Sequence, residues 1–261
     1  MLVFDEKKYA EEIINSKKYN TIKTQGRERC ILVRYLTSQG YTPDYIKSIL
    51  LEIPMSGGEY LTDKDKDVIF SKIINKANEY AFISNISVKI YQEEMDVIQS
   101  VEEDYARYLL FVYLVYYKWA CQVGHLQFFS KKNNIMMVIE NNSDIWKTAK
   151  LSKLRVADRY RLCNLLFNKG LYKIDNFKSH NYIYIPFVKD SGDVVIEINN
   201  YDNIIGELML FEKPNEYKRC AVCGVVIKRT RSPKKYCTSC AYKENLRKTK
   251  EKKKGLKTQI S

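Results

Sequence analysis

The chain has 261 residues, of which 45% are hydrophobic and 29% are charged. It is therefore long enough for two small domains and an appended module, and too apolar to be disordered. It carries 44 Lys and Arg against 31 Asp and Glu, a net charge of +13, and its most apolar run, residues 108–117, is too short to span a bilayer.

The expected location is the cytoplasm. Charged residues follow Met1 almost at once, so we expect no secretory signal peptide. Seven Cys is an odd number, and Cys30, Cys121 and Cys163 fall on apolar helical faces, where a thiol usually belongs to the core. A reducing compartment fits this pattern, and we expect no membrane partner.

Residues 1–85 predict a small helical domain. Apolar positions repeat there at helical spacing. Thr42 followed by Pro43 is a typical helix start, with Thr as the N-cap and Pro in the first turn, and Thr62 or Asp63 is expected to cap a further helix. No chemical motif occurs in this domain, which is either a protein-interaction domain or a scaffold.

Residues 86–205 predict a second domain. Alternation at Ile86, Val88 and Ile90 predicts a short strand, and Glu93 begins a long helix that reaches about residue 123, with a break near residue 100. Aromatic residues at helical spacing are either a base-stacking platform or, as we expect, the core side of this helix. They are Tyr105, Tyr108, Phe111, Tyr113, Tyr116, Tyr117 and Trp119.

The order of elements from residue 143 onward is typical of a winged helix. A short helix is expected up to residue 151, a break at 152–153, and a second helix from Arg155 to Lys169 with Val156, Tyr160 and Phe167 on one face. Strands are expected at 171–175, 182–188 and 194–198, the last two as a hairpin around a turn at 189–193. The helix at 93–123 is the first element of this predicted domain.

In such a domain the second helix enters the major groove with its N-terminal side chains. Arginine is well shaped for a bidentate contact with guanine, and a wing tip contacts phosphate or the minor groove. A winged helix that binds only protein is the alternative. The residues expected to contact DNA are Ser152, Lys153, Arg155, Arg159 and Lys189.

Two Cys-x-x-Cys pairs predict a metal site at residues 218–245, after a linker at 206–217. Cys220 and Cys223 are separated from Cys237 and Cys240 by thirteen residues, a spacing typical of structural zinc. Gly224 suits the positive φ that follows such a turn. We expect one structural Zn²⁺ per chain; two disulfides or four unrelated thiols are the alternatives.

The positive charge is concentrated at the C-terminal end, which includes a basic tail at 246–261. Residues 218–261 hold 15 Lys and Arg and 2 Asp and Glu, which gives +13, while residues 1–217 hold 29 of each sign. Such a cluster indicates phosphate binding, and a solvated tail is the alternative. The expected DNA contacts here are Lys228, Arg229, Arg231, Lys234, Lys235, Arg247 and Lys248.

The chain resembles winged-helix proteins with a C-terminal Cys₄ zinc module that phages and integrative elements of AT-rich Gram-positive bacteria carry. The resemblance covers residues 86–245 and implies a role associated with DNA. It depends on the strand before Glu93, Leu109-Leu-Phe-Val-Tyr-Leu, Asp144-Ile-Trp-Lys-Thr-Ala-Lys-Leu, Leu165-Leu-Phe-Asn-Lys-Gly-Leu and the four cysteines.

We therefore expect a mainly α protein with small β elements: an N-terminal helical domain, a winged helix-turn-helix domain and a zinc-ribbon or treble-clef-like module. The expected function is non-enzymatic binding of double-stranded DNA as a regulatory or accessory protein of a phage or mobile element. It would be a transcription regulator, or a recombination directionality factor acting with a serine integrase. RNA polymerase is the other expected partner.

The alternative is an adaptor that docks on a DNA-processing enzyme through its zinc module. A nuclease fits less well, because no His follows His180 and no acidic cluster lies near the cysteines in sequence.

Overall fold

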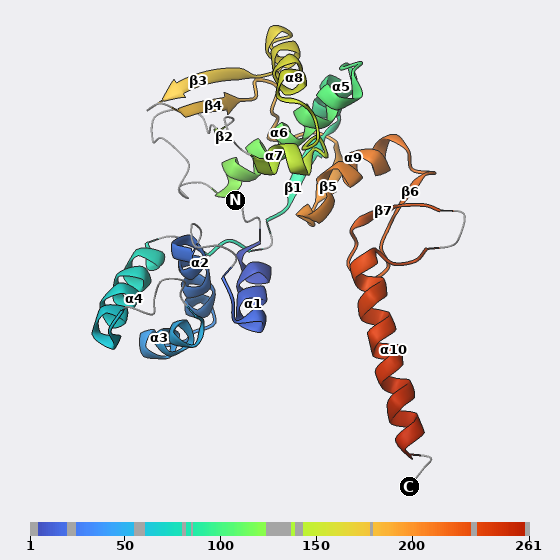
Figure 1. Ribbon diagram of the computed structural model, residues 1–261. Coiled ribbons are helices and arrows are strands. Elements are labelled where there is room, and N and C mark those ends of the chain that lie inside the picture. The colour runs from blue at the N-terminus through green and yellow to red at the C-terminus, as the bar shows by residue number, and fades with distance from the viewer. Residues whose placement is uncertain are drawn as a thin grey trace. The chain divides into compact units, whose positions relative to one another are not determined.

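The computed structural model is mainly helical, with a few short strands (Figure 1). Two compact units divide the chain: one comprises Met1–Ile86 with Trp119–Met137, and the other Ser87–Lys118 with Val138–Ser261. The structure describes residues 5–19, 25–54, 61–79, 82–84, 86–123, 137–138, 143–177, 180–230 and 234–258. Among these residues, no helix combines the length and the apolar character that crossing a membrane requires.

The first unit contains the predicted helices of the N-terminal region. They are α1 (Glu6–Ser16), α2 (Gln25–Ser38), α3 (Pro43–Glu52) and α4 (Asp63–Asn78). Both predicted caps are present: the side chain of Thr42 accepts a hydrogen bond from the backbone of Tyr45, and Thr62 forms a capping box with Asp65. A buried ion pair joins α1 to α2, since Nε of Arg34 donates to Oε2 of Glu6 over 2.9 Å.

The second unit contains the remaining elements, apart from residues 119–123 of α6 and Met137 of β2, which belong to the first unit. These elements are β1 (Val88–Tyr91), α5 (Gln92–Gln99), α6 (Asp104–Val123), β2 (Met137–Val138), α7 (Ser143–Thr148), α8 (Val156–Asn168), β3 (Lys173–Phe177), β4 (His180–Tyr184), β5 (Val194–Ile198), the 3₁₀ turn η2 (Tyr201–Asn203), α9 (Ile204–Glu212), β6 (Tyr217–Arg219), β7 (Val226–Lys228) and α10 (Thr238–Thr258).

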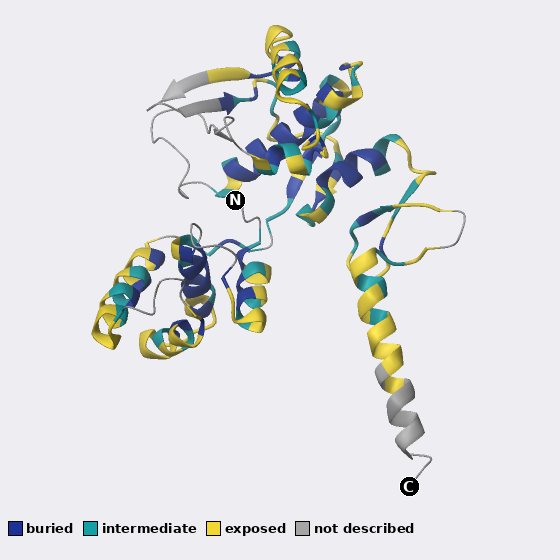
Figure 2. Cartoon of the chain, in the orientation of Figure 1, coloured by how far each residue is buried: buried dark blue, intermediate teal, exposed yellow. Residues whose placement is uncertain are grey.

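Helix α6 supplies the centre of the second unit. Phe111, Tyr113, Tyr116 and Tyr117 are buried, so the prediction of a core is confirmed for these aromatic side chains, whereas it is wrong for Tyr105, which is 48% exposed (Figure 2). Aromatic rings that are packed on all sides are not accessible to nucleic-acid bases, which removes the stacking platform for these four residues. The break predicted near residue 100 separates α5 from α6.

The strand pairing differs from the prediction. The hairpin is formed by β3 and β4, with Ile174 opposite Ile183, and β2 extends it on the β4 side. Strand β5 instead pairs antiparallel with β1, because Ile196 and Ile198 bury their side chains together with Val88 and Ile90. The predicted hairpin of 182–188 with 194–198 is therefore wrong.

Because β4 and β5 do not form a hairpin, Lys189 does not lie at a wing tip as predicted. Its backbone N–H donates to Oε1 of Glu94 over 2.8 Å, and its Nζ lies 2.5 Å from a carboxylate oxygen of Glu93. Lys189 thus belongs to the junction between α5 and the β4–β5 connection, where its charge is already paired.

The predicted linker at 206–217 is largely a packed helix. Residues 204–209 of α9 are all buried, including Leu208 and Glu207. An element of this kind connects the body of the second unit rigidly to the strands that follow it.

Candidate metal centre and basic module

The four cysteines of the two Cys-x-x-Cys pairs lie together. The Sγ atoms of Cys220, Cys223, Cys237 and Cys240 are all within 4.8 Å of one another, and those of Cys223 and Cys237 are 3.7 Å apart. A disulfide would require about 2.05 Å, and all four thiols are free. Four thiolates around one tetrahedral ion with metal–sulfur bonds of about 2.3 Å would lie about 3.8 Å apart. The cluster therefore fits a single metal ion.

The first pair lies in the connection between β6 and β7. These strands pair antiparallel, with Arg219 opposite Val226. The turn closes when the N–H of Gly224 donates to the carbonyl of Cys220 over 3.0 Å and the N–H of Cys220 donates to that of Val225 over 2.9 Å. Gly224 has a φ of +72°, which a residue with a side chain rarely adopts, so the glycine expected there is required.

The second pair lies at the beginning of α10. Cys240 is in its first turn, and Cys237 directly precedes it. Backbone N–H groups point at the sulfurs: that of Cys237 donates to Sγ of Cys220 over 3.2 Å, and that of Cys240 donates to Sγ of Cys237 over 3.4 Å. The first of these bonds joins the two pairs, and both stabilise negative charge on sulfur.

Cys220 and Cys240 differ in pKa because the cysteines share one small space. Burial disfavours the thiolate of Cys220, but hydrogen bonds from backbone N–H groups, first that of Cys223, lower its pKa to about 6. Hydrogen bonding with the neighbouring thiols of Cys237 and Cys223 raises the pKa of Cys240 to about 12. A soft divalent cation would remove this conflict, because it would balance the charge of all four thiolates.

The hairpin that carries the first pair is fixed to α9. The guanidinium of Arg219 donates two hydrogen bonds of 2.8 Å to the buried carboxylate of Glu207. The side chain of Asn203 donates to the carbonyl of Val226 over 2.7 Å. A Cβ on Gly206 would lie only 2.9 Å from Cβ of Val226, so the glycine permits this close approach. The cysteine cluster therefore belongs to the second unit, whose residues Asn203 and Glu207 hold the hairpin in place.

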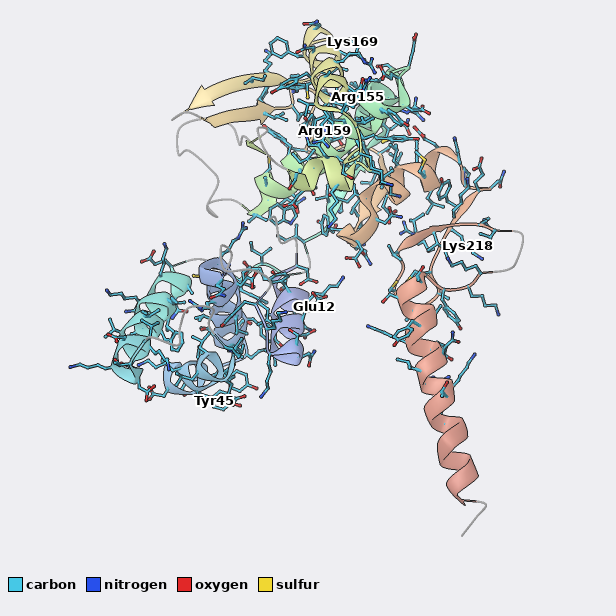
Figure 3. All side chains as sticks on the ribbon, viewed as in Figure 1. Glu12, Tyr45, Arg155, Arg159, Lys169 and Lys218 are labelled. Carbon is cyan, nitrogen blue, oxygen red and sulfur yellow. The ribbon has the colours of Figure 1, made fainter. Side chains whose placement is uncertain are left out.

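The basic residues predicted to contact DNA lie around this cluster. Lys234 and Lys235 are exposed, and Arg231 lies outside the described residues. Lys228 is 3.8 Å from a carboxylate oxygen of Glu216, and Nε of Arg229 donates to the carbonyl of Tyr217 over 3.1 Å. Figure 3 labels Lys218, which belongs to β6 of the hairpin. The described basic residues predicted to contact DNA therefore lie between the two Cys pairs in sequence and, on α10, after the second pair.

Helix α10 extends this surface and is exposed along most of the part whose burial is described (Figure 2). The acidic residues of 218–261 are Glu244 and Glu251. Both bind Arg247: two nitrogens donate to Glu244 over 2.7 and 2.9 Å, and a third donates to Glu251 over 2.6 Å. Lys248 lies farther from Glu244, at 3.8 Å, so its charge is the more available one.

The residues predicted at the start of α8 are less available for DNA. Arg159 donates from Nε to the carbonyl of Leu154 over 3.1 Å and also to that of Ser152, and its guanidinium lies 5.3 Å from the centre of the Trp146 ring. Arg155 is exposed, and its Nε donates to Asp158 over 3.0 Å. Ser152 and Lys153 are exposed. Figure 3 shows Arg155 and Arg159 near the base of α8.

The sequence reasoning missed the contribution of α9 to the site. Asn203, Gly206 and Glu207 hold the cysteine hairpin through side chains and close approach. A polar residue inside an otherwise apolar run, such as Glu207, was the available signal, because a buried carboxylate requires a cationic partner.

Comparisons of the chain with protein-family models, with curated proteins and with solved structures found no match. The function has to be inferred from the chemistry of the site.

Proposed function

We propose that the chain is a non-enzymatic DNA-binding accessory protein whose phosphate affinity lies in the C-terminal module. The single observation behind this is the placement of charge: residues 218–261 carry +13, and the rest of the chain is balanced. Those residues surround a compact cysteine cluster and continue into an exposed helix. A concentrated cationic surface of this kind gains affinity by releasing counterions from phosphate.

We propose zinc as the metal. Four sulfur ligands in a small cluster favour Zn²⁺, which prefers tetrahedral thiolate sites and needs no redox partner. Such a shell has no open position for a substrate, so the ion would be structural. Bound zinc would supply folding free energy to the hairpin of β6 and β7 and to the beginning of α10.

For the folds of the parts, we propose a winged-helix arrangement of α6, α7, α8 and the β3–β4 hairpin, and a treble-clef-like or ribbon-like arrangement of the zinc module. The order of the elements supports the first assignment. A knuckle between two short strands, with a second pair at a helix start, supports the other.

For the biological process, we propose that the chain acts as a protein of a phage or mobile element in the cytoplasm of the host cell. The chain would act as a transcription regulator with RNA polymerase or as a recombination directionality factor with a serine integrase. The resemblance of residues 86–245 supports this role.

The salt dependence of DNA binding tests the proposal. Replacing Lys243 and Lys248 of α10 by Gln should make the slope of log affinity against log salt shallower by about 0.9 for each lysine that contacts phosphate. The matched control replaces Lys64 and Lys72, which are exposed on α4, and should leave the slope unchanged. Equal slopes for wild type and the α10 variant would refute phosphate binding by α10.

The adaptor remains a second candidate, because the zinc module also exposes apolar side chains. Val222 lies between the first two cysteines, and Tyr242 and Leu246 lie one turn apart on α10. Such residues are typical of a docking surface. If Tyr242→Ser and Leu246→Ser abolish nuclease-resistant capture of a purified integrase or polymerase and leave DNA affinity intact, the adaptor is favoured.

A further inference from the structure

Helix α8 leaves a line of large apolar side chains in solvent. Val156, Tyr160 and Phe167 are 65%, 67% and 47% exposed, respectively. Their spacing places them on one face of the helix over about 16 Å, at 1.5 Å per residue. Ile174 on β3 is also exposed, close in sequence to Tyr172, whose ring contacts that of Phe167. We name Val156, Tyr160 and Phe167 the α8 patch.

The patch is not needed to hold α8 in the fold. Leu162 and Leu166 are completely buried and attach the helix to the body of the unit. The hydroxyl of Tyr172 donates to the carbonyl of Cys163 over 3.0 Å, which fixes the C-terminal half of α8. Single exposed apolar residues are ordinary, but three on one helical face are the pattern of a helix that meets a partner.

Positive charge lies next to the patch in sequence. Residues 152–174 include six Lys and Arg and one acidic residue, Asp158, and Glu103 pairs with Arg161, so these groups together carry +4. Asp158 is bound to Arg155, whose side chain is 85% exposed. Lys169 and Lys173 are exposed at the other end of α8, and Figure 3 labels Arg155 and Lys169 near the two ends of this helix. An apolar surface with a cationic rim is complementary to a surface that is apolar with an acidic rim.

The same observations argue against DNA and against a second copy of this chain as the molecule that binds the α8 patch. A helix that reads bases presents hydrogen-bond donors to their edges, whereas Val156 and Phe167 offer none and Arg159 is bound to two backbone carbonyls. A second copy of this chain would bring one net positive surface against another, which costs free energy.

We infer that the α8 patch docks an acidic amphipathic helix of a partner protein. Its apolar side chains pack on Val156, Tyr160 and Phe167, and its carboxylates face the cationic rim. Tyr160 is the central anchor, because it is the largest exposed side chain in the middle of the line and carries a hydroxyl that can donate at the rim.

Three synthetic helical peptides with the same apolar face and with acidic, neutral or basic polar faces test this inference. Binding of each labelled peptide to the full-length chain is measured by fluorescence anisotropy. We expect the acidic peptide to bind tightest and the basic peptide weakest. Tyr160→Ser should weaken the acidic peptide about tenfold or more, which is the usual effect of removing a central aromatic anchor. Circular dichroism verifies the fold of the variant.

The matched control is Tyr45→Ser, which removes a tyrosine that is 50% exposed on α3 and should leave peptide binding unchanged. Equal affinity for the three peptides, no binding to the wild-type chain, or full affinity of Tyr160→Ser would each overturn the inference. A loss of duplex-DNA affinity in Tyr160→Ser, without an effect on the peptide, would identify α8 as a DNA-contacting helix instead. Because this experiment reads peptide binding, it is independent of the proposed phosphate affinity of the zinc module.

Discussion

The Nζ atom of Lys118 lies 2.7 Å from Oε1 and 2.8 Å from Oε2 of Glu94, and the two side chains are 8% and 0% exposed. The cation also donates to the carbonyl of Lys189 over 2.9 Å and lies 4.3 Å from the centre of the Tyr91 ring. The carboxylate accepts from the backbone N–H groups of Tyr91 and Lys189. One ion pair therefore joins α5, α6, the end of β1 and the β4–β5 connection.

Removing one member of this pair should be costly. Lys118→Met leaves the buried carboxylate of Glu94 without a counterion, so we expect a loss of about 3–5 kcal/mol in the free energy of unfolding. Adding Glu94→Gln should recover part of the loss, since no buried charge then remains. Denaturant unfolding measures both. The control is Glu103→Gln, which breaks a partly exposed pair with Arg161 and should cost at most about 1 kcal/mol. Similar losses from Lys118→Met and Glu103→Gln would contradict this prediction.

The metal cluster predicts a defined stoichiometry. Protein purified without chelator should contain one zinc ion per chain by elemental analysis. Cys237→Ser should lower the zinc content and unfold the module, while Cys30→Ser, outside the cluster, should retain the ion. Protection of backbone amides from hydrogen exchange should be lost at residues 217–228 and kept in α6. Zinc-free protein that retains protection at 217–228 would show that the module folds without the metal.

Replacing Gly206 and Gly26 by alanine should change the stability of the protein in opposite directions. Both lie in helices, where Gly→Ala normally stabilises by about 0.5–1 kcal/mol. At Gly26 an added Cβ meets nothing within 4 Å, so Tm should rise. At Gly206 it would lie 2.7 Å from Cγ of Asn203 and 2.9 Å from Cβ of Val226, so overpacking should cost about 1–3 kcal/mol. A rise in Tm for Gly206→Ala would mean that α9 and β7 are not packed as described.

Alanine variants of Arg155 and Arg159 distinguish a contribution to DNA recognition from a contribution to stability. The sequence-based prediction assigns both to DNA, at about 1–3 kcal/mol for each bidentate contact. Arg159→Ala removes bonds to two backbone carbonyls, so it should lower stability as well. Arg155→Ala changes one exposed pair with Asp158 and is the cleaner test. Unchanged site preference in Arg155→Ala, measured on specific and scrambled duplexes, would remove α8 from base reading and agree with a protein-docking role.

Local chemistry was the part of this structure that the sequence predicted well. The caps at Thr42 and Thr62 and the turn at Gly224 follow from rules that involve a few neighbouring residues. The convergence of the four cysteines followed from their spacing, because each pair closes its own turn.

Features that depend on distant residues were not predicted. Strand β5 pairs with β1, far away in the chain, and its alternation is equally compatible with a hairpin to its nearer neighbour. In α4, Phe70 and Ile74 are buried, while Ile69 and Ile73 are partly buried against the same core, a distinction that helical spacing alone does not make. Helix α9 was missed because an apolar run without a polar face has no amphipathic period.

The contact of Gly206 with the β7 strand has a mechanical consequence for α10. The hairpin is held on α9, and α10 begins at the cysteines that the hairpin helps to hold, so the geometry of the cysteine cluster sets the direction of the long helix. Its 21 residues correspond to a length of about 31 Å, at 1.5 Å per residue. A change of about 10° in that direction would displace the far end by about 5 Å, on the order of one helical turn. Under the proposed phosphate binding, the geometry of the cluster would therefore determine which phosphates the far end of α10 reaches.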